Sequence, residues 1–193
     1  MITALVPSRG LLHTETVEAI DRELMGFEHH PTQYTHDKPI PDCFNYLSEK
    51  FLETDAKYAW FVEEDVVPPE GALKKLVDYM ETGYDISFIN YPLVKFNGEK
   101  CYKYFQGHIV WTGLGCTLVK REVFEKLKAP RFMGGYSLVA IMSGSAQTHW
   151  RIELRPNSKV IYGGQDVYFC TNAFLSGFKI GVVPNVECQH LLM

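Results

Sequence analysis

Short apolar runs alternate with stretches of helical periodicity along most of the chain. Residues 2–6 are apolar and rich in β-branched side chains and end at Pro7, a pattern that predicts a buried strand. Residues 14–25 then carry apolar side chains every three or four positions, between Thr14 and Gly26, which predicts a helix. Together the two segments form a β-α unit.

The same periodicities predict further elements. Four more helices are expected, at 44–52, 68–80, 121–127 and 165–177. Four more strands are expected, at 58–62, 85–90, 110–119 and 179–183. Residues 28–42 are predicted to form a strand fragment and an irregular loop. Residues 131–159 are rich in Gly and Ser and show no period, so we expect a mobile loop or lid there.

This alternation of strands and helices predicts an α/β fold with a mainly parallel central sheet flanked by helices. In such a sheet, ligands bind at the carboxyl ends of the strands. No internal repeat or second domain is visible, so a single domain spanning 1–193 is expected. A length of 193 residues with 46% hydrophobic and 22% charged residues is typical of one globular core.

Candidate chemistry begins directly after the strand expected at 58–62. Glu63, Glu64 and Asp65 are consecutive acids, which would repel one another unless a cation or solvent offset their charge. Mn²⁺ or Mg²⁺ takes oxygen ligands and commonly shares them between one or two carboxylates and a diphosphate. The run therefore predicts a metal site, and an acidic helix N-terminus is the structural alternative.

Two later segments carry further candidates. A glycine pair ending at Gly164 lets the backbone approach a ligand, and Asp166 then opens a helix, either as a general base or as a helix cap. Near the end of the chain, His190 follows the last predicted strand and could reach the same sheet edge as Asp65. It could supply a nitrogen ligand there, although a lone histidine is more often structural.

In this order the motifs resemble those of the GT-A-fold glycosyltransferases, especially the family-2-like group, over nearly the whole chain. The likeness rests on the acidic segment 61–69, the Gly-Gly-Gln-Asp segment 163–166, the terminal histidine and the glycine-bearing strand 111–120. The group usually has Glu in the third position of the second motif. The opening at 6–10 is similar to the first nucleotide-contacting loop of the group.

The resemblance implies a GT-A-type, Rossmann-like domain and a role for each matching residue. Asp65 and His190 would coordinate Mn²⁺ or Mg²⁺, and Asp166 would be the catalytic base. Residues 1–90 would bind nucleotide and metal, and residues 91–193 would meet the donor sugar and the acceptor. The donor contacts implied in this way are Pro7, Ser8, Arg9, Asn45, Glu63, Glu64, Gly113, Gly115 and Gly164.

Charge is segregated along the chain, although the net charge is only −4. Residues 1–90 carry a net −10, residues 91–160 a net +7 and residues 161–193 a net −1. The basic middle segment could face an anionic acceptor such as modified DNA, or the phosphates of the donor, or it could be a solvated face. Its aromatic residues could stack on a base or a sugar, but such side chains more often belong to the core.

We therefore expect a metal-dependent glycosyltransferase that moves a sugar from a nucleotide sugar, with a UDP-sugar as the expected donor, to an acceptor hydroxyl with inversion. A nucleotidyltransferase and a non-catalytic nucleotide- or glycan-binding module are the alternatives. The apolar opening before Pro7 is too short for a signal peptide or a membrane span, so a cytoplasmic protein is expected. The five cysteines contain no C-x-x-C pair and are expected to be reduced and buried.

Overall fold

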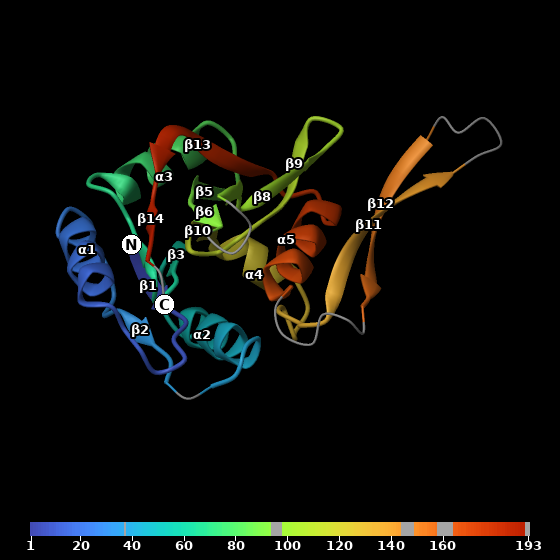
Figure 1. Cartoon of the computed structure of the whole chain (residues 1–193). Helices are drawn as coiled ribbons and strands as arrows, with labels where there is room; N and C mark the ends of the chain where they lie inside the picture. The colour runs from blue at the N-terminus through green and yellow to red at the C-terminus, as the bar shows by residue number, and fades with distance from the viewer. Residues whose placement is uncertain (37, 94–97, 144–148, 158–163, 192–193) are drawn as a thin grey trace.

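The structure is a computed structural model that describes residues 1–193 except 37, 94–97, 144–148, 158–163 and 192–193. A six-stranded sheet in the order β13-β5-β10-β3-β1-β2 forms its centre (Figure 1). These strands are β1 (Ile2–Val6), β2 (Gln33–Tyr34), β3 (Tyr58–Val62), β5 (Ile86–Asn90), β10 (Cys116–Lys120) and β13 (Ile180–Glu187). Only β10 runs antiparallel to its neighbours. The expected α/β fold with a mainly parallel sheet is confirmed, while its GT-A type stays a prediction.

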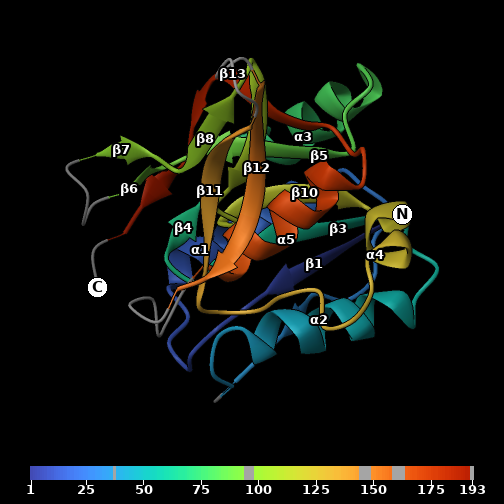
Figure 2. The same ribbon diagram turned by 90° about the vertical axis from the view of Figure 1, so that its right-hand side faces the viewer.

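Helices cover both faces of this sheet (Figure 2). Helices α1 and α3 pack on one face, and α2, α4 and α5 lie over the other. Their bounds are α1 (Thr14–Leu24), α2 (Asp42–Leu52), α3 (Ala72–Glu81), α4 (Arg121–Lys126) and α5 (Gln165–Leu175). Helix α3 begins after Gly71 and not at residue 68, because Gly71 takes the left-handed conformation with φ of 72°. Within the described ranges no helix is long and apolar enough to cross a membrane.

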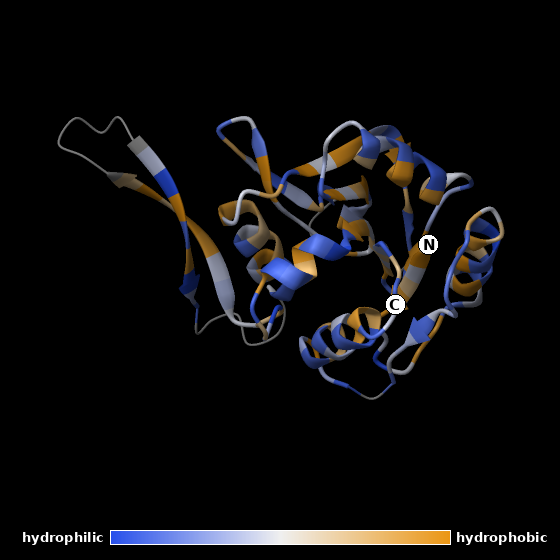
Figure 3. Ribbon diagram, turned by 180° about the vertical axis from the view of Figure 1, so that it is seen from behind, coloured by the Kyte–Doolittle hydropathy of each residue, from blue (hydrophilic) through white to orange (hydrophobic). Residues whose placement is uncertain are grey.

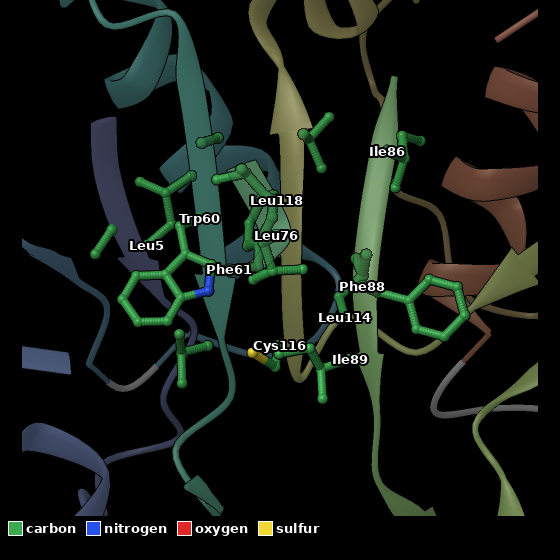
Figure 4. Close-up of a cluster of buried hydrophobic side chains, with 14 of the residues drawn as sticks. Leu5, Trp60, Phe61, Leu76, Ile86, Phe88, Ile89, Leu114, Cys116 and Leu118 are labelled. Carbon is green, nitrogen blue, oxygen red and sulfur yellow. The ribbon is translucent and has the colours of Figure 1, made fainter. Parts of the chain in front are cut away.

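Aromatic packing joins the sheet to the helices on the second face. Phe61 of β3 contacts Phe44 of α2, Phe124 of α4 and Phe132, with ring centroids 5.6 to 6.2 Å apart. Phe169 of α5 stacks on Phe132 with centroids 4.5 Å apart. On the central strands, Trp60 and Leu118 are register partners (Figure 4). Mostly apolar strands at the centre of the molecule (Figure 3) therefore account for its core.

The prediction of a mobile loop or lid at 131–159 is wrong for the secondary structure of this segment. Strands β11 (Tyr136–Ser143) and β12 (His149–Pro156) pair antiparallel, and this hairpin projects past α5 (Figure 1). The physical reason is an alternation of apolar and charged side chains in residues 150–155 that favours a strand. The mobility of the segment stays a prediction, and its residues 144–148 and 158–159 lie outside the described residues.

The single strand predicted at 110–119 is two strands that belong to different sheets. β9 (His108–Thr112) pairs with β8 (Tyr102–Phe105), and the chain then turns through Gly113 and Gly115 into β10. Two shorter pairs complete the fold among the described residues. One joins β6 (Pro92–Leu93) to β7 (Glu99–Lys100), and the other joins β4 (Val66–Val67) to β14 (Gln189–His190).

Replacement of Phe169 by Ala tests whether the aromatic cluster anchors α5. We expect a loss of about 3–5 kcal/mol in the free energy of unfolding, because the ring is fully buried and its removal leaves a cavity. The matched control is Leu175→Ala in the same helix, which is 56% exposed and should cost under about 1 kcal/mol. Chemical denaturation measures both, and equal losses would contradict the assignment.

Candidate active site at the carboxyl edge of the sheet

The end of β3 brings acidic residues and the last strand of the chain together. Glu63, Glu64 and Asp65 follow β3 directly, and the chain then forms β4. Since β14 pairs with β4, His190 lies opposite Val66. The Leu191 amide donates a hydrogen bond to the Asp65 carbonyl oxygen at 2.8 Å. The fold therefore brings the two predicted metal ligands, which are far apart in the sequence, into contact.

Glu64 is fully engaged by the loop that follows β1. Its Oε2 accepts hydrogen bonds from the Ser8 hydroxyl at 2.7 Å and the Arg9 amide at 2.8 Å. Its Oε1 pairs with Arg9 Nε at 2.9 Å. With a side chain 5% exposed, Glu64 positions this loop, and its oxygens have protein partners before any ligand arrives.

Asp65 and His190 form a partly buried pair. His190 Nε2 lies 3.5 Å from Asp65 Oδ2, and His190 Nδ1 lies 2.8 Å from the Pro92 carbonyl oxygen. The Nδ1–H therefore donates to Pro92, and Nε2 is the nitrogen that faces Asp65. Contact with Asp65 raises the pKa of His190. Burial opposes ionisation of Asp65, but His190 outweighs it, so the pKa of Asp65 lies below its ordinary value.

Glu63 is the acid of the three that the protein leaves uncompensated. It is half-buried, and its carboxylate accepts no hydrogen bond from any described residue. Burial raises the pKa of Glu63 to about 8, and the charges of Asp65 and Asp166 add to the increase. His190 and Arg9 oppose it. Glu63 is therefore close enough to Asp65, His190 and Asp166 for their charges to act on its pKa.

Asp166 lies in the first turn of α5, where the preceding Gly164 adopts a left-handed conformation with φ of 78°. The helix cap is Gly164, so Asp166 does not occupy the capping position considered as its structural alternative. Burial raises the pKa of Asp166 to about 6, although the backbone amides of Val167 and of Asp166 itself lower it. Residue 163, the other glycine of the predicted pair, lies outside the described residues.

A small pocket of about 190 Å³ opens beside these acids. Pro7, Ser8 and Arg9 form one wall, and the three acids 63–65 form another. Ile40, Cys43, Phe44 and Gln165 complete the lining. A larger pocket of about 650 Å³ lies at the opposite end of the sheet and includes Tyr104, which is 60% exposed. We assign the site to the smaller pocket, because the cluster of interacting acids lies there.

The predicted glycines Gly113 and Gly115 have a steric partner in the protein, Tyr91. A Cβ atom on Gly113 would lie within 3.0 Å of the Tyr91 ring, and one on Gly115 would lie 2.6 Å from Tyr91 Cε1. Tyr91 in turn packs edge-on against His190, with centroids 5.3 Å apart. Tyr91 was not among the residues predicted from the sequence, because no local pattern distinguishes it from a core tyrosine. The two glycines therefore leave the space that the Tyr91 ring occupies, and this ring contacts His190.

Asn45 does not line the pocket. Its amide donates to the Phe132 carbonyl oxygen at 2.8 Å and accepts from the Phe132 amide at 3.0 Å. Both ends of the side chain thus hold the segment that leads into the β11–β12 hairpin. Its predicted contact with a nucleotide stays untested.

The residues present suit a metal bound jointly with a ligand. Two ligands that each lie roughly 2.1 Å from one ion are about 3.0–3.5 Å apart, and Asp65 and His190 have this spacing. In the described part of the chain, no group of three or more His, Cys, Asp or Glu side chains could hold a metal ion. The remaining ligands of such an ion would have to be oxygens of a substrate or water.

Fold and site together describe an α/β protein with a charged pocket at the carboxyl edge of its sheet. Its structure is similar to that of A197 from STIV, with a TM-score of 0.69 and 20% sequence identity over 100% of this chain and 86% of A197. At this identity the likeness shows the fold alone.

A second solved structure gives a much lower score. It is a glycosyltransferase involved in the glycosylation of the major capsid of PBCV-1, with a TM-score of 0.33 and 14% identity over 67% of this chain and 68% of that chain. No protein-family profile matches the chain, and no curated protein matches it in sequence.

Replacement of Glu63 by Gln tests the uncompensated carboxylate. Because the pKa is about 8 in the folded protein and 4.5 in the reference state, Glu63 stabilises the fold fully below about pH 4.5. That contribution is lost as pH rises through 8. In chelator-containing buffer, Glu63→Gln should match the wild-type Tm near pH 5 and exceed it increasingly towards pH 8.5. A constant difference in Tm across this range, like that expected for the exposed control Glu122→Gln, would contradict the assignment.

Replacement of Gly115 by Ala tests whether the packing of the Tyr91 ring requires a glycine at this position. The added methyl group meets Tyr91 and Val66 Cγ2 at under 3.0 Å, so we expect a loss of about 1–3 kcal/mol in the free energy of unfolding. Gly26→Ala is the control, since a Cβ atom there meets nothing within 4 Å. If Gly115→Ala is as stable as Gly26→Ala by denaturant titration, the ring does not require the glycine.

Proposed function

We propose that this chain is a metal-dependent glycosyltransferase that moves a sugar from a nucleoside-diphosphate sugar to an acceptor hydroxyl. The observation that carries the proposal is the convergence of the Asp65–His190 pair and the half-buried Glu63 and Asp166 at one edge of the sheet. Acids of raised and lowered pKa gathered in one cleft are typical of catalytic sites.

The donor would bind with its nucleoside end in the small pocket. At about 190 Å³ this pocket is below the roughly 300–1,000 Å³ that usually encloses a whole small-molecule ligand, so it would hold only part of the donor. Glu63 accepts hydrogen bonds and therefore suits the ribose hydroxyls. Residues 1–90 would supply most of these contacts, and we propose a UDP-sugar as the donor.

Asp65 and His190 would hold Mn²⁺ or Mg²⁺ together with the diphosphate oxygens of the donor. When bound, the ion supplies positive charge that stabilises the departing diphosphate. Because His190 Nδ1–H donates to the Pro92 carbonyl oxygen, Nε2 would be the nitrogen that binds the ion. Arg9, whose side chain is 54% exposed and fixed by Glu64, adds a positive charge at the rim.

Asp166 would act as the general base. Its carboxylate would accept the proton of the acceptor hydroxyl as that oxygen bonds to the anomeric carbon, while the bond from this carbon to the diphosphate breaks. Direct displacement of this kind inverts the anomeric configuration. A pKa of about 6 leaves Asp166 mostly ionised at pH 7, yet more basic than an ordinary aspartate.

The acceptor would approach through residues 91–193. The basic segment 91–160 includes the exposed Arg151 and Arg155 on the β11–β12 hairpin. These charges suit an anionic acceptor, modified DNA among them. Binding to such a polymer would weaken steeply with added salt, because phosphate contacts release counterions.

Replacement of Asp166 by Asn tests the base. The variant should lose roughly 10²–10⁴-fold in the rate of sugar transfer while its affinity for UDP stays within about twofold. Wild-type transfer should fall below about pH 6, as Asp166 becomes protonated. Release of UDP is followed by chromatography with a panel of UDP-sugars and Mn²⁺, which also distinguishes transfer from the pyrophosphate release of a nucleotidyltransferase. Undiminished transfer by the variant would remove Asp166 from this role.

Replacement of Asp65 by Ala tests the metal site. Calorimetric titration should show that Mn²⁺ strengthens UDP binding to the wild type at least about tenfold, and that Asp65→Ala loses this effect. The control is Asp78→Ala, an exposed aspartate that pairs with Lys74 on α3. An equal Mn²⁺ effect in all three proteins would exclude Asp65 as a ligand.

A further inference from the structure

Gln165 is a polar group in the pocket wall whose side chain has no hydrogen-bond partner among the described residues. It is the first residue of α5 and is only 7% exposed. Its Oε1 is buried and accepts no hydrogen bond, and neither end of the amide bonds to any described residue. Exchange of the amide oxygen and nitrogen would put an N–H group at the buried position, which would then need an acceptor instead of a donor.

A buried amide oxygen without a hydrogen bond destabilises the folded state, commonly by about 1–3 kcal/mol. Four other buried polar atoms share this deficit among the described residues, and they belong to Thr3, Thr16, Trp60 and Thr171. None of these four side chains lines the pocket beside Glu63 and Asp65, whereas Gln165 does. At Gln165, unlike at the other four residues, a bound ligand could therefore supply the missing hydrogen bond.

The neighbouring polar groups have their own partners. The Ser8 hydroxyl and the Arg9 guanidinium contact Glu64, and Asp65 contacts His190. Glu63 can only accept hydrogen bonds when ionised, and a diphosphate offers only acceptors. The Gln165 amide can accept a hydrogen bond from a ribose hydroxyl at Oε1 and donate one from Nε2 to a phosphate oxygen, so it can pair with both parts of a nucleoside diphosphate.

We propose that the Gln165 amide hydrogen-bonds the nucleoside diphosphate portion of the donor and sets its position in the pocket. This inference rests on the proposed function of the site. Gln165 is a binding residue, since it takes no part in the transfer of the sugar.

The test compares two buried, unpartnered side chains of the same helix. Gln165→Met and Gln165→Leu remove the amide at similar volume, and Thr171→Val removes a hydroxyl far from the pocket. Each change should leave the Tm of the ligand-free protein equal to or above that of the wild type, because an unpaired polar group is lost. Only the Gln165 variants should weaken binding, with Kd for UDP or GDP in the presence of Mn²⁺ rising about tenfold by calorimetry.

The outcomes separate this inference from the proposed function. If the wild type binds neither UDP nor GDP with Mn²⁺, both are overturned. If it binds and the Gln165 variants bind within about twofold of it, the inference about Gln165 alone is overturned. A lower Tm in both Gln165 variants would also overturn it, since the amide would then stabilise the fold itself.

Discussion

Electrostatic compensation of three adjacent carboxylates is the constraint on which the site depends. The fold compensates them unequally. Glu64 has hydrogen bonds to both oxygens, and Asp65 has His190, whereas Glu63 receives no hydrogen bond from the described residues and its pKa is raised to about 8. A cation at this edge would favour ionisation of Glu63 and replace the proton that it otherwise holds. A bound cation beside the pocket would therefore be stabilised by the carboxylate of Glu63.

Packing away from the charges holds this arrangement in place. The stack of Phe169 on Phe132 fixes α5, and α5 carries Gln165 and Asp166 into the site. On the other side, the Tyr91 ring packs against Gly113 and Gly115, which have no side chains, and contacts His190. The hydrophobic core and the charged site are therefore coupled, because the same side chains serve the stability of the fold and the geometry of the edge.

Sequence periodicity was sufficient for β1, β3 and β5, since buried strands in an α/β sheet are short apolar runs, as in residues 58–62, but it did not separate β9 from β10. It failed where composition masked a real alternation, because glycine and serine outweighed the strand pattern of residues 150–155. Tertiary relations had no local signal at all. That Glu64 binds the first loop, or that Gly113 and Gly115 accommodate Tyr91, depends on contacts between segments distant in the chain.

Paramagnetic broadening by Mn²⁺ tests most directly whether three distant segments share one cation site. In ¹H–¹⁵N spectra recorded with UDP, substoichiometric Mn²⁺ should broaden the amide signals of Asp65, Asp166 and Leu191 together. Signals of Gly177 and Lys179, at the opposite end of the sheet beside the larger pocket, should stay sharp. Broadening confined to one of the three segments, or spread over exposed acids elsewhere, would contradict a shared site.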